Sequence, residues 1–188
     1  MAFASWWLLP ELAGKARTPN FDIAFTCRIG SAPGIALVEA KAHHRELEEA
    51  SAGKSLGGGS KKDSPINAAR SHETISAAIE EARKELSAET GLAWGINCDR
   101  CYQMSNRFAW AWKLAELGVP TVLVYLGFID ATDMDGRLIE SENQWRSAVL
   151  AHGQGVIPEE VWGRVWSIGG TPFHALIRAQ RTPLSLIG

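Results

Sequence analysis

The sequence lacks a large excess of charge of either sign. Its 188 residues include 19 Lys and Arg and 21 Asp and Glu, which gives a formal net charge of −2 at pH 7. A basic excess is the usual electrostatic sign of a nucleic-acid-binding protein. Its absence lowers the expectation of such a partner, although a neutral protein can still contain a positive cleft. Hydrophobic residues make up 46% of the chain and charged residues 21%, values typical of a soluble globular protein.

Cysteine and long apolar runs are also scarce. The three cysteines are Cys27, Cys98 and Cys101, and an odd number at uneven spacing argues against the disulfide framework of a secreted protein. No stretch reaches the roughly 18 apolar residues of a membrane span. The apolar start, residues 1–12, lacks a basic leader and contains Pro10, unlike a signal peptide. We therefore expect a cytoplasmic protein with no membrane partner.

The length fits a single domain over residues 1–188. Residues 51–64 stand apart because they combine the run Gly57–Gly59 with Lys and Ser, a composition typical of a flexible insertion. No internal repeat or second-domain boundary is visible. Pro158 and Pro172 occupy positions where helices often begin, so we expect a helical C-terminal part.

The spacing of apolar residues predicts strands and helices in alternation. Strands are expected at residues 5–9, 21–27, 35–41 and 121–129, and helices at residues 65–88, 99–117 and 141–152. The run 121–129, TVLVYLGFI, is apolar throughout, which indicates a central strand covered on both faces. Residues 21–27 and 35–41 are separated by a short break rich in Gly and Pro, which indicates an antiparallel pair. The pattern predicts an α/β protein with a mixed central β-sheet flanked by helices.

Charged residues end the strand expected at residues 35–41, where Glu39 and Lys41 share one face. Charged side chains are almost never buried unless they are paired or bound to a metal. With Asp22 on the neighbouring strand, two carboxylates converge as hard oxygen ligands for one or two divalent cations. Such cations stabilise the charge on a phosphodiester and lower the pKa of an attacking water, which Lys41 would orient or deprotonate. The competing interpretation is a salt bridge at a strand end.

These residues resemble the PD-(D/E)XK nuclease superfamily, which has the restriction endonuclease-like fold. Pro19-Asn20-Phe21-Asp22 stands where that family has its Asp, and Glu39-Ala40-Lys41 stands where it has its acid-x-Lys. The resemblance covers roughly residues 5–130. It implies a restriction endonuclease-like core in the order helix, three strands, helix, strand. It also implies Mg²⁺ or Mn²⁺ held by Asp22 and Glu39, and a catalytic role for Asp22, Glu39 and Lys41.

The resemblance further implies polar residues contributed by helices on either side of these strands. A first helix usually supplies a Glu to the metal site, but few residues precede the first expected strand, and Glu11, the nearest acid, lies beyond it. Some family members place a polar residue of the following helix near the site. Gln103, Asn106 and Arg107 are candidates here, and Arg107 has the fork geometry to bind a phosphate with two hydrogen bonds. The competing interpretation is a solvated helix face.

The sequence therefore predicts a metal-dependent nuclease that hydrolyses the phosphodiester bonds of nucleic acid, with DNA as the expected substrate. Lys61 and Lys62 of the insertion would add positive charge near the nucleic-acid backbone. The alternative is a catalytically inactive restriction endonuclease-like module that binds DNA or a protein partner, and a homo-oligomer is compatible with either. A thiol redox protein using Cys98 and Cys101 is a third alternative, but buried structural thiols explain this pair more simply.

Overall fold

The computed structural model describes residues 2–8, 18–50, 52–53, 65–132 and 136–181. Its elements in chain order are α1 (Ala2–Trp7), β1 (Ile23–Ile29), β2 (Ala32–Lys41), α2 (His44–Glu49), α3 (Pro65–Thr90), α4 (Tyr102–Glu116), β3 (Thr121–Ile129), α5 (Glu142–His152), the 3-10 helix η2 (Glu159–Val161), β4 (Val165–Ile168) and β5 (Thr171–Arg181). No helix in these residues has the length and apolarity needed to cross a membrane. Most of the insertion expected at residues 51–64, including Lys61 and Lys62, lies outside the described residues.

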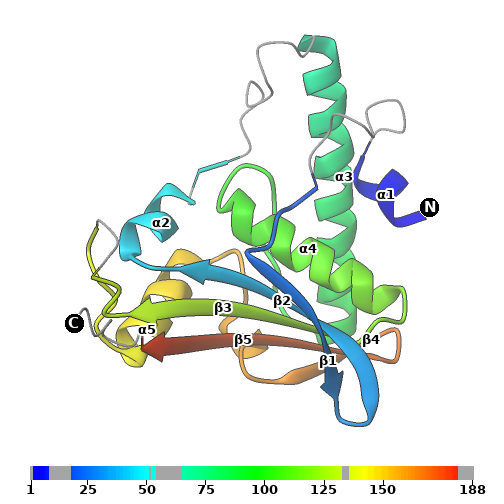
Figure 1. The fold of residues 1–188 in the computed structure, drawn as a ribbon. Helices are drawn as coiled ribbons and strands as arrows, with labels where there is room; N and C mark the ends of the chain where they lie inside the picture. Colours follow the sequence, from blue (N-terminus) through cyan, green and yellow to red (C-terminus); the bar gives the residue numbers. More distant parts are fainter. Residues whose placement is uncertain (1, 9–17, 51, 54–64, 133–135, 182–188) are drawn as a thin grey trace.

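The strands form one five-stranded sheet in the order β1-β2-β3-β5-β4 (Figure 1). β1 and β2 are an antiparallel hairpin, as the break between them predicted. β2, β3 and β5 run parallel to one another, and β4 pairs antiparallel with β5 at the far edge. The predicted α/β class, with a mixed central sheet flanked by helices, is therefore confirmed.

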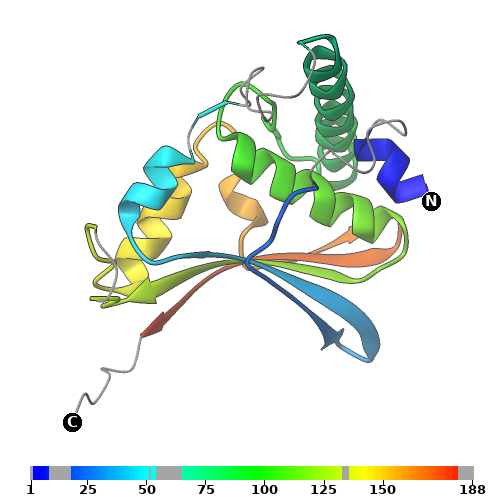
Figure 2. The same cartoon turned by 45° about the horizontal axis from the view of Figure 1, so that its top comes forward.

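The helices that connect the parallel strands lie on one face of this sheet (Figure 2). The chain passes from β2 to β3 through α3 and α4, and from β3 to β5 through α5, always in the same direction across the sheet. Because crossovers are right-handed almost without exception, two steps in one direction place their helices on the same side. In the described part of the chain the opposite face has no helix. The expectation that strand 121–129 is covered on both faces is therefore wrong for these residues.

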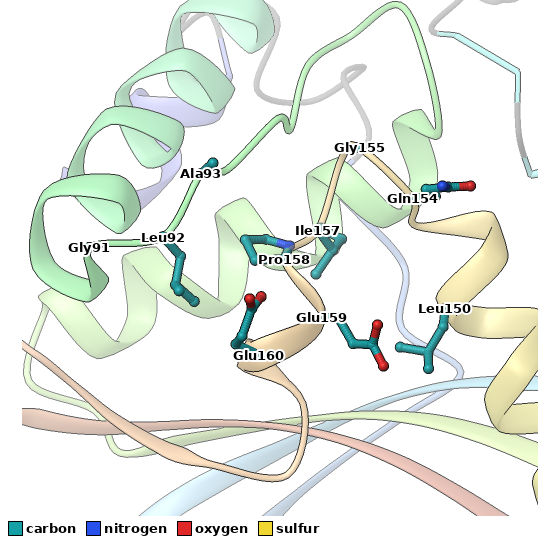
Figure 3. A pocket seen from close by; sticks show the side chains of 10 residues that line it. All are labelled: Gly91, Leu92, Ala93, Leu150, Gln154, Gly155, Ile157, Pro158, Glu159 and Glu160. Carbon is teal, nitrogen blue, oxygen red and sulfur yellow. The ribbon is translucent and has the colours of Figure 1, made fainter.

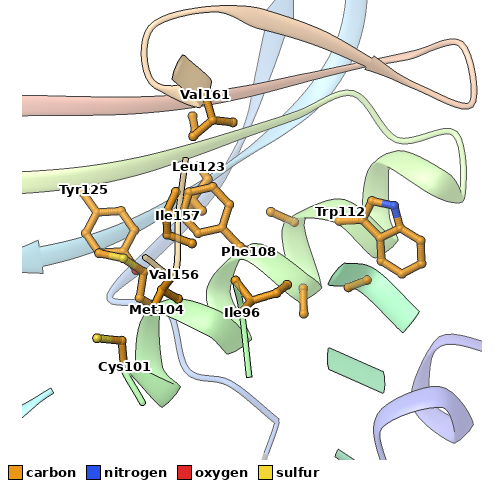
Figure 4. Packing of buried hydrophobic residues seen from close by; sticks show 14 of the residues in the cluster. Ile96, Cys101, Met104, Phe108, Trp112, Leu123, Tyr125, Val156, Ile157 and Val161 are labelled. Carbon is orange, nitrogen blue, oxygen red and sulfur yellow. The ribbon is translucent and has the colours of Figure 1, made fainter. Parts of the chain in front are cut away.

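The hydrophobic core lies between the sheet and these helices. Phe108 of α4 is at its centre, with its ring centroid 5.3 Å from that of Trp94 and 5.4 Å from that of Trp162. Around it pack side chains from α4, from β3 and from the segment leading into η2 (Figure 4). Aromatic pairs at these separations add to the stabilisation that comes from burying apolar area. The core therefore fixes α4 across the sheet, above β3 and β5.

The strand expected at residues 5–9 is wrong, because residues 2–7 form the helix α1. Successive side chains of a strand point to opposite faces, whereas the adjacent Trp6 and Trp7 both reach neighbouring helices. Trp7 lies 5.7 Å from Trp110 and Trp6 lies 6.0 Å from Trp112, measured between ring centroids. Within the described residues, two strands therefore precede α4 where the restriction endonuclease-like order has three.

The expectation of a helical C-terminal part is also wrong in its last third. Helix α5 and the short η2 are present, and Pro158 directly precedes η2 as predicted. Residues 171–181 nevertheless form β5, where the alternating Phe173, Ala175 and Ile177 are buried beside β3. Pro172 is the second residue of this strand and does not begin a helix, a place near a strand start where Pro is tolerated.

Gly127 of β3 gives a test of how closely α5 packs on the sheet. A Cβ atom at Gly127 would lie 2.6 Å from the ring of the buried Trp145 of α5. We expect Gly127→Ala to lower the free energy of unfolding by about 1–3 kcal/mol, the usual cost of overpacking a core. Urea denaturation monitored by Trp fluorescence measures this change.

The matched control is Gly153→Ala at the end of α5. Its added Cβ would meet the flexible sulfur of Met104 at 3.2 Å, and its backbone has an ordinary φ of −79°. We expect a change within about 1 kcal/mol there, since Gly to Ala at a compatible position also restricts the unfolded chain. An equal loss in both variants would contradict the close packing of Trp145 against β3.

Candidate functional site at the carboxyl end of β2

The carboxyl ends of β2, β3 and β5 meet at one edge of the sheet, because these three strands are parallel. Ligands of open α/β sheets bind beyond this edge. Glu39 and Lys41 are the last charged residues of β2, and both point to the helix-covered face. Glu39 is 1% exposed and Lys41 is 8% exposed. The structure therefore places two ionisable side chains inside the protein at the usual position of a functional site.

Glu39 is held by two cations. Its Oε1 accepts a hydrogen bond from Lys41 Nζ at 2.5 Å, and its Oε2 accepts one from Arg107 Nε at 2.6 Å. Arg107 comes from α4 and is itself buried, at 6% exposure. The sequence predicted the pairing of Glu39 with Lys41 as one interpretation of the motif. It did not predict that Arg107 would contact Glu39.

Arg107 also connects α4 to the segment that precedes β1. Its Nη2 donates to the carbonyl oxygen of Asn20 at 2.6 Å, and its Nη1 donates to Asn106 Oδ1 at 2.7 Å. The guanidinium group lies 4.9 Å from the ring centroid of Phe21, a cation–π contact. Each of its three nitrogens therefore has a protein partner, so the side chain is fixed in place.

Asp22 lies just before β1, and its side chain is exposed. Its Oδ2 accepts a hydrogen bond from the backbone N–H of Ala40 at 2.7 Å, and its own N–H donates to the carbonyl oxygen of Val38 at 3.0 Å. Ala40 is the residue between Glu39 and Lys41. The structure therefore brings Asp22 to the part of β2 that carries both other residues of the predicted site.

The carboxylates of Asp22 and Glu39 are chemically suited to a hard divalent cation, but too few of their oxygen atoms are free to bind one. Carboxylate oxygens are the ligands that Mg²⁺ prefers, and Asp22 and Glu39 supply them. Among the described residues, however, no group of three or more His, Cys, Asp and Glu side chains could hold a metal ion. Both oxygens of Glu39 are bonded to cations, so a metal ion at Glu39 would compete with Lys41 or Arg107.

The other predicted site residues are not brought to this cluster. Gln103 of α4 is half-buried, and its side chain takes no part in the hydrogen bonds of Glu39, Arg107 and Asp22. Lys61 and Lys62 lie outside the described residues. Cys98 and Cys101 are not joined in a disulfide and both are buried, and Cys101 Sγ lies 3.2 Å from the carbonyl oxygen of His152. The alternative of an accessible redox pair at Cys98 and Cys101 is therefore wrong.

Two residues near the site were missed by the sequence analysis. Tyr125 of β3 is paired in register with Glu39, and burial, followed by the charge of Glu39, raises the pKa of its phenol well above the ordinary value. Its hydroxyl has no hydrogen-bond partner in the described residues. His152 ends α5, and burial, followed by the charges of Lys41 and Arg100, lowers its pKa. For Tyr125, the sequence signal that could have revealed it was the presence of a tyrosine in an otherwise apolar strand.

A separate hollow of about 470 Å³ lies between the loop after α3 and the segment around η2 (Figure 3). Leu92, Ile157 and Pro158 contribute apolar walls, and Glu159 and Glu160 contribute two carboxylates. None of its lining residues is basic, and none belongs to the cluster around Glu39. The hollow is therefore poorly suited to bind a phosphate group.

Comparisons with protein-family models, with curated proteins and with solved structures find no match for this chain. The resemblance to PD-(D/E)XK nucleases therefore depends on residues 19–22 and 39–41 and on their positions in the sheet. Because one fold can support many functions, function has to be argued from the side chains of the site.

The buried ion pairs of Glu39 lead to a prediction about stability. We expect Arg107→Met to lower the free energy of unfolding by about 3–5 kcal/mol, because it leaves a desolvated carboxylate with one cation fewer. The double variant Glu39→Gln/Arg107→Met should lose less than the sum of the single variants, since contacting residues are coupled. Urea denaturation measures both. The control Arg83→Met breaks the exposed pair with Glu80 on α3 and should cost below about 1 kcal/mol.

The lowered pKa of His152 leads to a prediction about pH. The unfolded chain binds a proton at His152 near pH 6.5, whereas the folded protein binds it only at lower pH. The contribution of His152 to stability is therefore present above pH 6.5 and is lost as the pH falls through this value. NMR titration of the imidazole should give a midpoint below 6.5 that rises in Lys41→Met. A midpoint unchanged by this substitution would contradict the influence of Lys41.

Proposed function

We propose that the site at the carboxyl end of β2 is a metal-dependent phosphodiesterase site of the PD-(D/E)XK type, acting on nucleic acid and most directly on DNA. The observation that supports it is the hydrogen bond between Asp22 Oδ2 and the N–H of Ala40 at 2.7 Å. It joins the two halves of the motif, which lie 18 residues apart, one before β1 and the other at the end of β2. The hairpin does not need these charged groups for its stability, neither the buried Glu39 and Lys41 nor the Asp22 carboxylate bonded to β2.

The proposed roles follow from the exposure and charge of each side chain. Asp22 is exposed, so its carboxylate is accessible to Mg²⁺ or Mn²⁺ together with Glu39. Such an ion, when bound, supplies positive charge at the phosphodiester and lowers the pKa of the attacking water. Lys41 lies beside Glu39 and would orient that water and offset the phosphate charge. Because the net charge of the chain is only −2, attraction of the nucleic-acid backbone would depend on such local cations.

A catalytically inactive binding module is the second candidate, and one observation favours it. Both oxygens of Glu39 are hydrogen-bonded to Lys41 and Arg107. In this candidate Glu39 is a structural counter-ion that holds α4 on the sheet, and no metal ion is bound. The module would keep the fold and would bind DNA or a protein without hydrolysing it.

A cleavage assay tests the proposal against this alternative. Supercoiled plasmid and linear DNA are incubated with the protein and with Mg²⁺, Mn²⁺ or EDTA. We expect cleavage only with a metal ion, and a loss of about 100-fold or more in Asp22→Asn and Lys41→Met, the usual scale of a lost acid–base or charge-stabilising group. Asp22→Asn is the most informative variant, because the residue is exposed and the amide oxygen can still accept the Ala40 hydrogen bond.

The matched control is Glu85→Gln, which removes an exposed carboxylate on α3, far from β2 in sequence. It should cleave as fast as the wild type. Equal cleavage by the wild type and all site variants would contradict the proposed site. DNA binding without cleavage under any metal ion would support the inactive module.

A further inference from the structure

The face of the sheet opposite the helices, called the open face below, is apolar on β1, β2 and β3 and carries the polar His174 and Arg178 on β5. Strand pairing defines it, because residues paired across neighbouring strands point to the same side. One row runs from Phe25 of β1 through Ala36, Val122 and His174 to Val165 of β4, and so crosses all five strands. A second row follows Ile23, Val38, Val124 and Leu176. The residues between these rows, such as Leu37 and Leu123, are buried under the helices.

Large hydrophobic side chains are exposed at both edges of the open face. Phe25 is 51% exposed, Ile23 is 46% exposed and Val165 is 61% exposed. The other exposed large hydrophobic residues of the described chain, Ile66 and Leu117, lie on or just after helices, away from the sheet. Contiguous exposed apolar surface of a few hundred Å² marks an interaction site in a folded protein. The open face therefore has the character of an interface.

The strand order explains why no described helix covers the open face, where Ala36 and Val38 are already buried in a single copy. Parallel strands are normally covered on both faces, yet both crossovers of this chain place their helices on one side (Figure 2). The second layer that a parallel sheet requires must therefore come from outside the described helices.

The size of the open face matches what a stable dimer buries. The five strands contain from 4 to 11 residues, and at about 4.8 Å between strands and roughly 3.3 Å per residue they span about 650 Å². A standard protein interface removes about 800 Å² from each partner. Two sheets can pack face to face at a separation of about 10 Å with their side chains interdigitated. The open face is therefore close in size to one side of an interface between two copies of the sheet.

The charge of the open face favours a second copy as the occupant. Its side chains on β1, β2 and β3 include no charged residue, so it offers nothing to attract a nucleic acid or a charged peptide. Arg178 of β5 is exposed near the carboxyl end of the face, where a polar rim belongs. A second copy brings an identical uncharged apolar face through a two-fold axis. With a net charge of −2, two copies repel each other little.

We propose that this protein forms a homodimer in which the open faces of two copies pack against each other. Phe25 and Val165 mark the two edges of the interface, and β3 lies near its centre. Glu39, Lys41 and Arg107 lie on the opposite, helix-covered side of the sheet, so the dimer leaves the candidate site accessible. The proposal does not depend on the nuclease function.

The oligomeric state in solution tests this proposal. Light scattering coupled to size exclusion, and sedimentation velocity between about 1 and 100 µM, should give twice the chain mass of 20.5 kDa for the wild type. The double variant Phe25→Lys/Val165→Lys should weaken dimerisation by 100-fold or more and give the monomer mass. Both residues are already exposed, so the substitutions leave the folded monomer intact, which circular dichroism and thermal unfolding check.

The control is Ile66→Lys/Leu117→Lys, which places two lysines at equally exposed hydrophobic positions off the open face. It should remain dimeric. A monomeric wild type at 100 µM would overturn the proposal, including the case in which another segment of the same chain covers the open face. A dimer that persists in Phe25→Lys/Val165→Lys would overturn it as well, because the interface would then lie elsewhere.

Discussion

The arrangement of α4 on the sheet depends on the burial of one carboxylate, that of Glu39. An ionised carboxylate at 1% exposure is stable only with counter-charges and hydrogen bonds for its oxygens. Lys41 supplies one from the same strand, and Arg107 supplies the other from α4. Because Arg107 also bonds to the carbonyl oxygen of Asn20, a single guanidinium group links α4, β2 and the segment before β1. The start and the end of the hairpin are thereby both held against α4.

The sequence predicts the contact between Glu39 and Lys41, which are close in the chain, but not the contact between Glu39 and the distant Arg107. Alternate residues of a strand point to the same face, so the sequence alone places Glu39 beside Lys41 on β2. The contact of Arg107 with Glu39 spans 68 positions and depends on the rotation of α4. The sequence does not specify that rotation, because polar and apolar residues are both buried on this helix. The same applies to Tyr125, whose pairing with Glu39 depends on the register of two parallel strands. Residues 5–9 were assigned to a strand because of their apolar side chains, including two adjacent tryptophans. Residues 171–181 were expected to be helical because of Pro172. In both segments the tertiary contacts, which the sequence does not show, decide the structure.

The strand order divides the molecule into two chemically different sides. On the helix-covered side, the carboxyl end of β2 is polar, and Glu39 is paired with both Lys41 and Arg107. On the open face, the rows that begin at Phe25 and Ile23 are apolar from β1 to β3. Both properties follow from one topological fact, since crossovers that proceed in a single direction cover one face and leave the other for a partner. A binding event on either side would therefore leave the other side available.

The charges of the cluster also determine what a cation at Glu39 would require. Asp22, Glu39, Lys41 and Arg107 are two acids and two bases, so their formal charges cancel. A divalent ion placed among them would give this region a net positive charge, which is costly in a partly desolvated site. A phosphodiester that accompanied the ion would bring one negative charge and halve this excess, and a guanidinium or ammonium group released from Glu39 could bind it. Under the proposed function, metal and phosphodiester would therefore bind together more favourably than either would alone. This coupling would distinguish an active site of this kind from a structural ion pair, which has no need of either ligand.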